Sequence, residues 1–214
     1  MKISKRLKCI ADMIPNNSNV IDVGCDHGLL SIYLYSEKKC NVLATDVNKN
    51  ALESAKSNIK KYNVPNVKTK LTDGLNNIDV KEYDYIVIAG MGTNTIKNIL
   101  NNKVLSNNII LSSNNQLYEL RKYVTKLGYY IIDEKFVEDH QKKYVIMSFK
   151  KGYKKYSKND LLYGPIVKNN SDYLAFELEK LLNIKSKIKD SNVFVKMRNN
   201  RDIRRIKRLI NNII

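Results

Sequence analysis

The residues best suited to chemistry lie in a glycine-containing turn near the start of the chain. The apolar run Val20–Val23 predicts a strand that leads through this turn into a helix beginning at Leu29. Gly24 lets the backbone approach a ligand closely, and Gly28 lets the helix pack against its strand. A dinucleotide-binding turn would place a third glycine where Asp26 stands, because a fixed carboxylate repels a diphosphate. A carboxylate attracts a cationic sulfonium instead, so the turn favours S-adenosylmethionine over a nicotinamide cofactor.

Later strands end in further candidates for ligand binding. Asp46 ends the second predicted strand, where its carboxylate can accept hydrogen bonds from ribose hydroxyls, with capping of the next helix as the alternative. Asp73 and Gly74 follow the third strand and can contact an adenine amino group, although Asp-Gly is also an ordinary turn. Small residues after the fourth strand let a planar base come close. The predicted cofactor-binding residues are Asp22, Gly24, Cys25, Asp26, His27, Gly28, Asp46, Val47, Asp73, Gly74, Ala89, Gly90 and Met91.

Two side chains are candidates for the chemical step. The first turn delivers Asp26 near the reactive end of the cofactor, where its carboxylate can bind or deprotonate a nucleophile; bonding to backbone amides of the turn is the structural alternative. Asn114 follows the fifth strand and can hydrogen-bond a target base, with helix capping as its alternative. His27 can act as a base, but it is equally suited to capping or packing at a helix start.

The spacing of apolar residues predicts the elements that position these side chains. The predicted strands of the alternating strand and helix pattern are Val20–Val23, Val42–Thr45, Val67–Leu71, Tyr85–Ala89 and Ile109–Ser112. The predicted helices are the segment from the Ser4 cap to Met13, residues 29–36, Ala51–Tyr62 and Gln116–Lys126, which Gly128 follows. Tyr129–Val137 and Tyr144–Phe149 predict a terminal hairpin, because the link Glu138–Lys143 is too short for a helical crossover. This indicates an α/β fold with the mostly parallel, seven-stranded, Rossmann-like sheet of class I methyltransferases, closed by an antiparallel hairpin.

The chain is expected to comprise a cofactor-binding catalytic domain over residues 1–150 and a second unit over residues 151–214. Residues 151–167 are interpreted as a basic linker, and Ser171 as the cap of a following helix. Two stripes at three-four spacing predict a C-terminal helical hairpin or short coiled coil. The stripes are Leu174, Leu178, Leu181 and Ile188, and then Ile203, Ile206, Ile210 and Ile213.

Charge and composition limit the class of protein. The net charge of the 214 residues is +17, and residues 151–214 hold 16 Lys and Arg against 6 Asp and Glu, so a polyanionic partner is expected. No apolar run is long enough to span a bilayer, and Asp12 and Pro15 interrupt the start of the chain before a signal peptide could develop. The three cysteines show neither disulfide nor zinc-site spacing, so we expect a cytoplasmic protein without a metal site or membrane partner.

Together the motifs resemble one family, the bacterial tRNA adenine-N1-methyltransferases that modify adenine 22. The positions that carry the resemblance are Ser4–Leu7, Asp22–His27, Asp73–Leu75, Ile88–Gly92, Asn114, Arg121 and Gly164–Pro165. The resemblance implies a Rossmann-like catalytic domain, a C-terminal coiled coil, S-adenosylmethionine as donor, tRNA as substrate, and Asp26 near the target adenine. The chain departs from the family pattern at Ser112 and Ser113, which stand for Gln-Pro, at Thr93, which stands for glycine, and at Ser31, which stands for proline. These departures are expected to change details of the base pocket.

The function expected from this resemblance is transfer of a methyl group to N1 of adenine 22 in tRNA by direct in-line attack, with a monomer as the acting species. Asp26 and Asn114 are the expected catalytic residues. The expected RNA-binding residues are Lys5, Arg6, Arg121, Lys154, Lys155, Arg201, Arg204, Arg205 and Arg208. The alternatives are a methyltransferase for another RNA or base, a non-catalytic RNA-binding relative, and an NAD-dependent dehydrogenase, which should possess the missing glycine.

Overall fold

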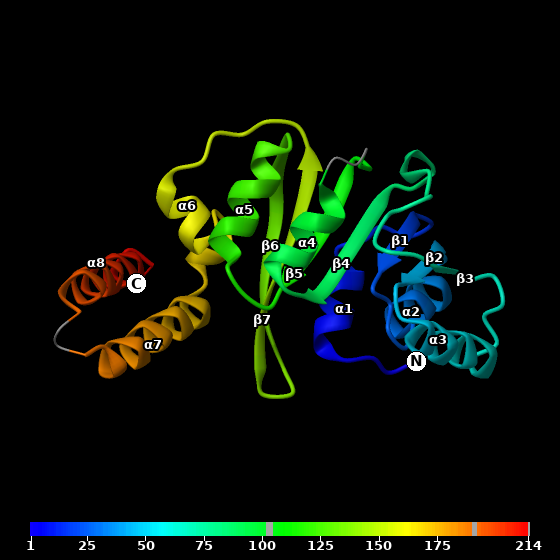
Figure 1. Cartoon of the computed structure of the whole chain (residues 1–214), viewed down its shortest axis with the longest axis horizontal. Coiled ribbons are helices and arrows are strands. Elements are labelled where there is room, and N and C mark those ends of the chain that lie inside the picture. Colours follow the sequence, from blue (N-terminus) through cyan, green and yellow to red (C-terminus); the bar gives the residue numbers. More distant parts are fainter. Residues whose placement is uncertain (102–104, 190–191, 214) are drawn as a thin grey trace. The chain divides into compact units, whose positions relative to one another are not determined.

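The computed structural model describes residues 1–101, 105–189 and 192–213, and it contains two compact units (Figure 1). The first unit is Met1–Lys155 and the second is Tyr156–Ile214. The boundary expected after residue 150 falls before the last residue of strand β7 (Lys142–Lys151). The division between the units therefore follows the end of the sheet.

The first unit is built on a seven-stranded sheet in the described part of the chain, with the strand order β3-β2-β1-β4-β5-β7-β6. The other strands are β1 (Asn19–Val23), β2 (Asn41–Asp46), β3 (Lys68–Leu71), β4 (Tyr85–Met91), β5 (Asn108–Ser113) and β6 (Tyr129–Asp139). The pairs among β1 to β5 are parallel, whereas β7 pairs antiparallel with both β5 and β6. The predicted fold class is confirmed.

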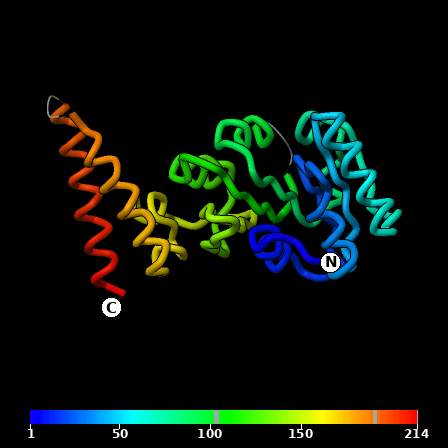
Figure 2. The backbone as a smooth tube through the Cα atoms, turned by 90° about the horizontal axis from the view of Figure 1, so that it is seen from below, coloured from blue at the N-terminus to red at the C-terminus, as the bar shows by residue number. Residues whose placement is uncertain are grey.

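Helices cover both faces of this sheet. They are α1 (Lys5–Asp12), α2 (Leu29–Lys38), α3 (Lys49–Lys61), α4 (Thr93–Leu100) and α5 (Leu117–Lys126), with a short 3-10 turn at Val80–Glu82. Helix α2 contacts α1 and α3, while α4 contacts α5, and Figure 2 shows α1 and the α4–α5 pair on opposite sides of the strands. Because both faces are covered, the central strand β4 buries Ile86, Val87 and Ile88 completely.

Local signals explain where the elements begin and end. The Ser4 side chain accepts a hydrogen bond from the Leu7 amide, so the predicted cap of α1 is confirmed. Strands β6 and β7 extend further towards each other than expected, because His140 and Gln141 adopt positive φ angles of 48° and 63° and form a tight turn. The predicted link Glu138–Lys143 was therefore too long.

The second unit is helical, but its start differs from the sequence prediction. It contains α6 (Lys158–Tyr163), a 3-10 turn at Val167–Asn169, α7 (Ser171–Lys187) and α8 (Val193–Asn211). The predicted linker 151–167 is wrong in part, because Ser157 and Asp160 form a capping box that starts α6. The predicted cap Ser171 is also wrong, since the Asn170 side chain accepts from the Tyr173 amide.

The predicted helical hairpin is present in the second unit. Helices α7 and α8 pack together, Ile203 and Ile206 are buried, and the Asn199 side-chain amide donates to the Leu181 carbonyl at 3.1 Å. Ile188 caps the end of α7 and Ile213 lies beyond α8, so both stripes end earlier than the spacing indicated. No helix in the described part of the chain is long and apolar enough to span a membrane.

Candidate active site

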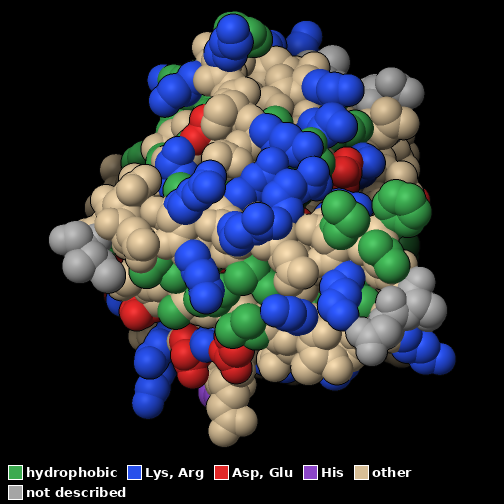
Figure 3. All heavy atoms as spheres, turned by 90° about the vertical axis from the view of Figure 1, so that its left-hand side faces the viewer, with side chains coloured by type: hydrophobic (Ala, Val, Ile, Leu, Met, Phe, Trp, Pro, Cys, Tyr) green, Lys and Arg blue, Asp and Glu red, His purple; other side chains and the backbone are tan. Residues whose placement is uncertain are grey.

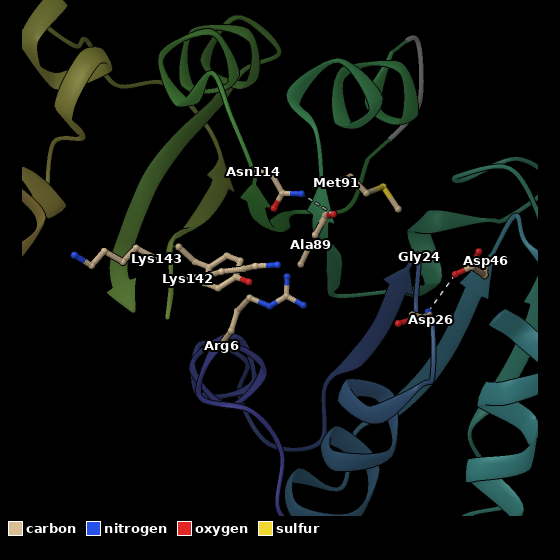
Figure 4. Close-up of a pocket in the computed structure, with 11 residues that line it drawn as sticks. Arg6, Gly24, Asp26, Asp46, Ala89, Met91, Asn114, Lys142 and Lys143 are labelled. Atoms are coloured by element: carbon tan, nitrogen blue, oxygen red, sulfur yellow. Dashed lines mark hydrogen bonds between the residues drawn. The ribbon is translucent and has the colours of Figure 1, made fainter. Parts of the chain in front are cut away.

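Two adjoining cavities lie where β1, β2 and β4 end, and they share Gly24, Asp46 and Met91 in their linings. The larger cavity has a volume of about 760 Å³ and the smaller one about 280 Å³. Residues that line the larger cavity, shown in Figure 4, are Arg6, Gly24, Asp26, Asp46, Ala89, Gly90, Met91, Asn114, Lys142, Lys143 and Tyr144. The smaller cavity is lined in part by Val47, Thr72, Asp73, Gly74, Thr95, Asn98 and Ile99.

The first turn brings two carboxylates to one wall of the larger cavity. Asp26 has a φ angle of 50°, and its amide donates to Asp46 Oδ2 at 3.1 Å. Strand β2 stabilises the turn, because the amides of Gly24 and Cys25 donate to the Thr45 carbonyl at 2.8 and 2.9 Å. The exposed side chain of Asp26 is therefore positioned through its backbone, and its Oδ2 atom also lies 3.6 Å from His27 Nε2.

Gly24 is required for both conformation and space. Its φ angle is +74°, and a Cβ atom there would lie 2.1 Å from Met91 Cε. We expect Gly24→Ala to weaken binding of S-adenosylhomocysteine at least roughly tenfold, because a strained turn and a displaced Met91 would alter the linings of both cavities. Calorimetric titration measures this change.

Gly128→Ala is the matched control for Gly24→Ala. Gly128 has a φ angle of +85°, but a Cβ atom there would meet nothing within 4 Å. This substitution should cost about 1 to 2 kcal/mol of stability through backbone strain and leave ligand affinity unchanged. Equal ligand affinity of the two variants would contradict the role given to the space above Gly24.

Asp46 lies where the two cavities meet. Its Oδ1 atom accepts from the Asn48 amide at 2.8 Å, while the Asn48 side chain accepts from the amides of Asn50 and Ala51 and caps α3. Asn48, and not Asp46, is therefore the cap of α3. A carboxylate at this junction is suited to accept hydrogen bonds from ribose hydroxyls.

The opposite side of the larger cavity is formed where β4 and β5 end. The register between these strands shifts between Ala89 and Met91, and Gly90 has a φ angle of 86°. Such a bulge is common beside active sites because it redirects neighbouring groups. Asn114 stabilises it, since its Nδ2 atom donates to the Gly90 carbonyl at 2.9 Å and its amide donates to the Met91 carbonyl at 3.0 Å. The amide oxygen of Asn114 can then accept a hydrogen bond from a ligand.

Most of the chain is similar to proteins of a known family. The profile of a family described as a methyltransferase domain matches residues 3–147, which include α1 and almost all of the sheet. The chain belongs to this methyltransferase family. The dehydrogenase alternative is therefore not supported.

Individual relatives of the methyltransferase agree with the resemblance stated from its motifs. The tRNA (adenine(22)-N(1))-methyltransferase of Bacillus subtilis is 32% identical over 153 residues, or 69% of this chain and 64% of that protein, so the match spans less than two thirds of that relative. The structure of the B. subtilis m1A22 tRNA methyltransferase TrmK has a TM-score of 0.83 with 27% identity, covering 98% of this chain and 99% of the other. The M. capricolum TrmK complex with S-adenosyl-homocysteine has a TM-score of 0.87 and 27% identity, with all of both chains covered.

Four of the predicted cofactor-binding residues of this methyltransferase line neither cavity. Cys25 is buried under the turn, and Gly28 packs against Ala55. His27 Nδ1 lies 2.7 Å from Ser54 Oγ, so its side chain contacts α3. Asp22 is buried beneath the turn. The structure places these four residues within or beneath the turn and outside both linings, so their direct contact with the cofactor stays a prediction.

Asp22 forms a buried pair with one of the residues at which the chain departs from its family. Ser31 Oγ donates to Asp22 Oδ2 at 2.6 Å, so the serine supplies a hydrogen bond that the expected proline lacks. Burial raises the pKa of the Asp22 carboxyl from 3.8 to about 6, although the hydrogen bond from Ser31 opposes the rise. The folded protein therefore binds more protons than the unfolded chain between about pH 4 and pH 6.

A pH dependence of stability follows from Asp22. Its contribution should be fully present below the unfolded pKa of 3.8 and be lost as the pH rises to about 6, which costs about 3 kcal/mol. Asp22→Asn removes this titration while the amide oxygen can still accept from Ser31. The free energy of unfolding, measured with urea from pH 4 to pH 7, should therefore fall less steeply with pH in the variant. The same slope in both proteins would contradict burial of an ionisable group here.

Two of the other departures from the family pattern, Thr93 and Ser113, connect the start of α4 to the segment that follows β5. The Thr93 amide donates to Asn115 Oδ1 at 3.0 Å, its hydroxyl donates to the Asn115 carbonyl at 2.7 Å, and Ser113 Oγ lies 2.9 Å from that hydroxyl. Thr93 begins α4 and needs no positive φ angle. Gly92 forms the cap of this helix. Nothing in the structure explains Ser112, whose buried hydroxyl has no hydrogen-bond partner within the described residues.

Three residues of the larger cavity were absent from the sequence prediction. Lys142, Lys143 and Tyr144 begin β7. Because β7 runs antiparallel to β5, its beginning lies at the edge where the parallel strands end. The predicted hairpin therefore contained this signal, whereas the predicted cofactor-binding residues all came from the carboxyl ends of parallel strands and the turns that follow them.

One predicted RNA-binding residue is in the wrong place for that role. Arg121 is completely buried, and its Nε atom donates to Glu134 Oε1 at 2.8 Å. It stabilises the packing of α5 on β6 and cannot contact RNA.

The other basic candidates lie nearer the surface. Those with exposed side chains are Lys5, Lys154, Lys155, Arg201, Arg204 and Arg208. Arg6 lines the larger cavity, and the half-buried Arg205 pairs with Asp202 at 3.1 Å. Figure 3 shows lysine and arginine side chains gathered across one face of the molecule, with few acidic ones among them. The described residues contain no group of three His, Cys, Asp or Glu side chains placed to hold a metal ion.

Proposed function

We propose that this methyltransferase transfers a methyl group from S-adenosylmethionine to N1 of adenine 22 in tRNA. The observation that carries the proposal is the linked pair of carboxylates, in which the Asp26 amide donates to the Asp46 side chain at the junction of the two cavities. Asp46 can hold a ribose, and Asp26 stands where a diphosphate would be repelled.

The linings of the cavities fit the proposed cofactor. The smaller cavity offers Asp73 and Gly74 to an adenine and Asp46 to its ribose, while Gly24 and Met91 pack against each other where the two cavities adjoin. When bound, S-adenosylmethionine supplies a methyl group whose bond to sulfur breaks as the bond to N1 forms, leaving S-adenosylhomocysteine. The larger cavity is lined by Asp26 and Asn114, which suits it to receive the target base.

The residues of the chain contribute mainly alignment. N1 of neutral adenine carries a lone pair, so no proton has to be removed before attack. Asp26 can accept a hydrogen bond from the N6 amino group, which orients the ring and stabilises the growing positive charge. Asn114 can contact the same edge of the base with its amide oxygen. Proximity and alignment supply most of the rate enhancement in such a site.

Access to N1 requires contacts with the rest of the tRNA. N1 lies on the Watson–Crick edge, so the adenine must be unpaired before reaction, at a cost that backbone contacts elsewhere have to offset. Exposed arginines of α8, including Arg201, Arg204 and Arg208, are suited to bind phosphates.

The test is transfer of labelled methyl groups to an unmodified tRNA transcript. Wild type should label the transcript. A variant in which Arg201, Arg204 and Arg208 are changed to Gln should need more tRNA for half-maximal rate and show a weaker salt dependence, since each lost phosphate contact lowers the logarithmic salt slope by roughly 0.7 to 0.9. Binding of S-adenosylhomocysteine without any transfer to tRNA would favour another substrate or the non-catalytic alternative.

A further inference from the structure

Arg6 extends from α1 into the wall of the larger cavity (Figure 4). Its guanidinium carbon lies 5.0 Å from the centroid of the Tyr144 ring, a cation–π distance. On another side, Arg6 Nη1 would lie 3.2 Å from a Cβ atom on Gly90. The planar guanidinium is thus held between an aromatic face and a position without a side chain.

The backbone of Arg6 is held by the same hairpin that supplies Tyr144. The buried Asp139 lies at the end of β6, and its two carboxylate oxygens accept from the amides of Lys5 and Arg6, each at 3.3 Å. These amides belong to the first turn of α1, where helix amides have no partner within the helix. Asp139 and Tyr144, on the two strands that flank the His140–Gln141 turn, therefore fix the start of α1 and the direction of the Arg6 side chain.

Opposite charges face each other across the larger cavity. Asp26 and Asp46 contribute carboxylates from the β1 and β2 side. Arg6 of α1 and Lys142 of β7 contribute cations, while the side chain of Lys143 points away from the two carboxylates (Figure 4). A ligand that fits both sides carries hydroxyl or cationic groups at one end and an anion at the other.

We infer that Arg6 forms an oxyanion-binding subsite in the larger cavity, with Tyr144 and Asp139 as its positioning residues. An arginine is suited to this task because its planar fork binds a carboxylate or a phosphate through two parallel hydrogen bonds. Under the proposed function, which this inference deepens, the oxyanion is either the carboxylate of the cofactor or a phosphate of the target nucleotide. Both present the same chemistry to Arg6.

The experiment compares Arg6→Gln, Arg6→Lys, Tyr144→Leu, Tyr144→Phe and Asp139→Asn with wild type. Arg6→Gln should weaken binding of the oxyanion roughly 10- to 100-fold, and Arg6→Lys should restore part of it because a point charge remains. Tyr144→Leu should weaken it roughly threefold to tenfold, whereas Tyr144→Phe keeps the aromatic face and should resemble wild type. Asp139→Asn should act in the same direction as Tyr144→Leu.

Tyr33→Leu is the matched control. Lys8 of α1 lies 5.8 Å from the ring centroid of Tyr33 of α2, so α1 takes part in a second cation–π pair. Neither Lys8 nor Tyr33 lines the larger cavity. The control should leave ligand affinity at the wild-type value. Thermal unfolding of all variants separates a loss of folding from a loss of binding.

Two titrations identify the source of the oxyanion. A higher Kd for S-adenosylhomocysteine in Arg6→Gln and Tyr144→Leu assigns the subsite to the cofactor carboxylate. An unchanged Kd for that ligand, with a higher KM or Kd for the tRNA transcript, assigns it to a phosphate. If folded Arg6→Gln binds both ligands as wild type does, or if Tyr144→Phe is as impaired as Tyr144→Leu, the inference is wrong. Failure of wild type to methylate tRNA would refute the proposed function, while both binding titrations would still test the subsite.

Discussion

Asp26→Asn is expected to lower kcat for methyl transfer roughly 100- to 1,000-fold while leaving the Kd for S-adenosylhomocysteine close to the wild-type value. The substitution removes the carboxylate that accepts a hydrogen bond from the N6 amino group. It also removes the negative charge that stabilises the positive charge developing on the adenine ring. Asn tolerates the left-handed backbone that Asp26 adopts at a φ angle of 50°. The Asp26 amide can therefore still donate to Asp46, and the turn that lines the cavity should survive.

Asp12→Asn provides a control for the loss of a carboxylate. Asp12 is exposed and pairs with Lys8 at 3.2 Å on α1, away from the lining of the larger cavity. It should leave kcat unchanged. Single-turnover rates at saturating tRNA report the chemical step for both variants. A full rate in Asp26→Asn would show that Asp26 serves the structure of the turn alone.

Arg121→Met is expected to lower the free energy of unfolding by about 3 to 5 kcal/mol, because it leaves the Glu134 carboxylate buried without its charged partner. Both side chains of this pair are completely buried, so water cannot replace the arginine. Chemical denaturation with urea measures the loss.

A double variant separates the ion pair from the loss of volume. Arg121→Met combined with Glu134→Met removes both charges, and most of the lost stability should return. Folded Arg121→Met should bind tRNA as wild type does, since residue 121 is not exposed. Unchanged stability together with weaker tRNA binding would restore the RNA-binding role that its burial excludes.

Local signals made much of the fold predictable from the sequence. The central strands β1, β4 and β5 are mostly apolar and buried, and Ser4 and Gly128 mark the ends of helices, so these elements lie close to their expected positions. The capping box of Ser157 and Asp160 was equally visible, but the glycines around it favoured a linker. At the start of α7, Asn170 and Ser171 are both good caps, and composition alone does not choose between them.

The candidate site was predictable where it depends on single turns. Gly24, Asp26 and Asp46 line the cavities because each follows directly from the end of a parallel strand. Arg121 could not be placed, since its burial depends on the packing of α5 on β6, which brings Glu134 to its guanidinium. The positive charge of Arg121 favoured a contact with RNA, but residue type alone does not show whether a side chain is buried.

The contribution of α1 and β7 to the site was also hidden from local patterns. Arg6 points into the larger cavity because Asp139 and Tyr144, both distant in sequence, hold it there. Lys142 reaches the same cavity only through the direction of β7. Such placements come from the pairing of strands and the docking of a helix, which a periodicity of apolar residues does not encode.

The central claim is tested most directly by mapping the nucleotide that wild type methylates. An unmodified tRNA transcript is incubated with the protein and S-adenosylmethionine, digested and analysed by mass spectrometry, beside a transcript that carries guanine at position 22. The account predicts N1-methyladenine at position 22 of the first transcript and no methylation of the second. Methylation of another position, or equal methylation of both transcripts, would contradict it.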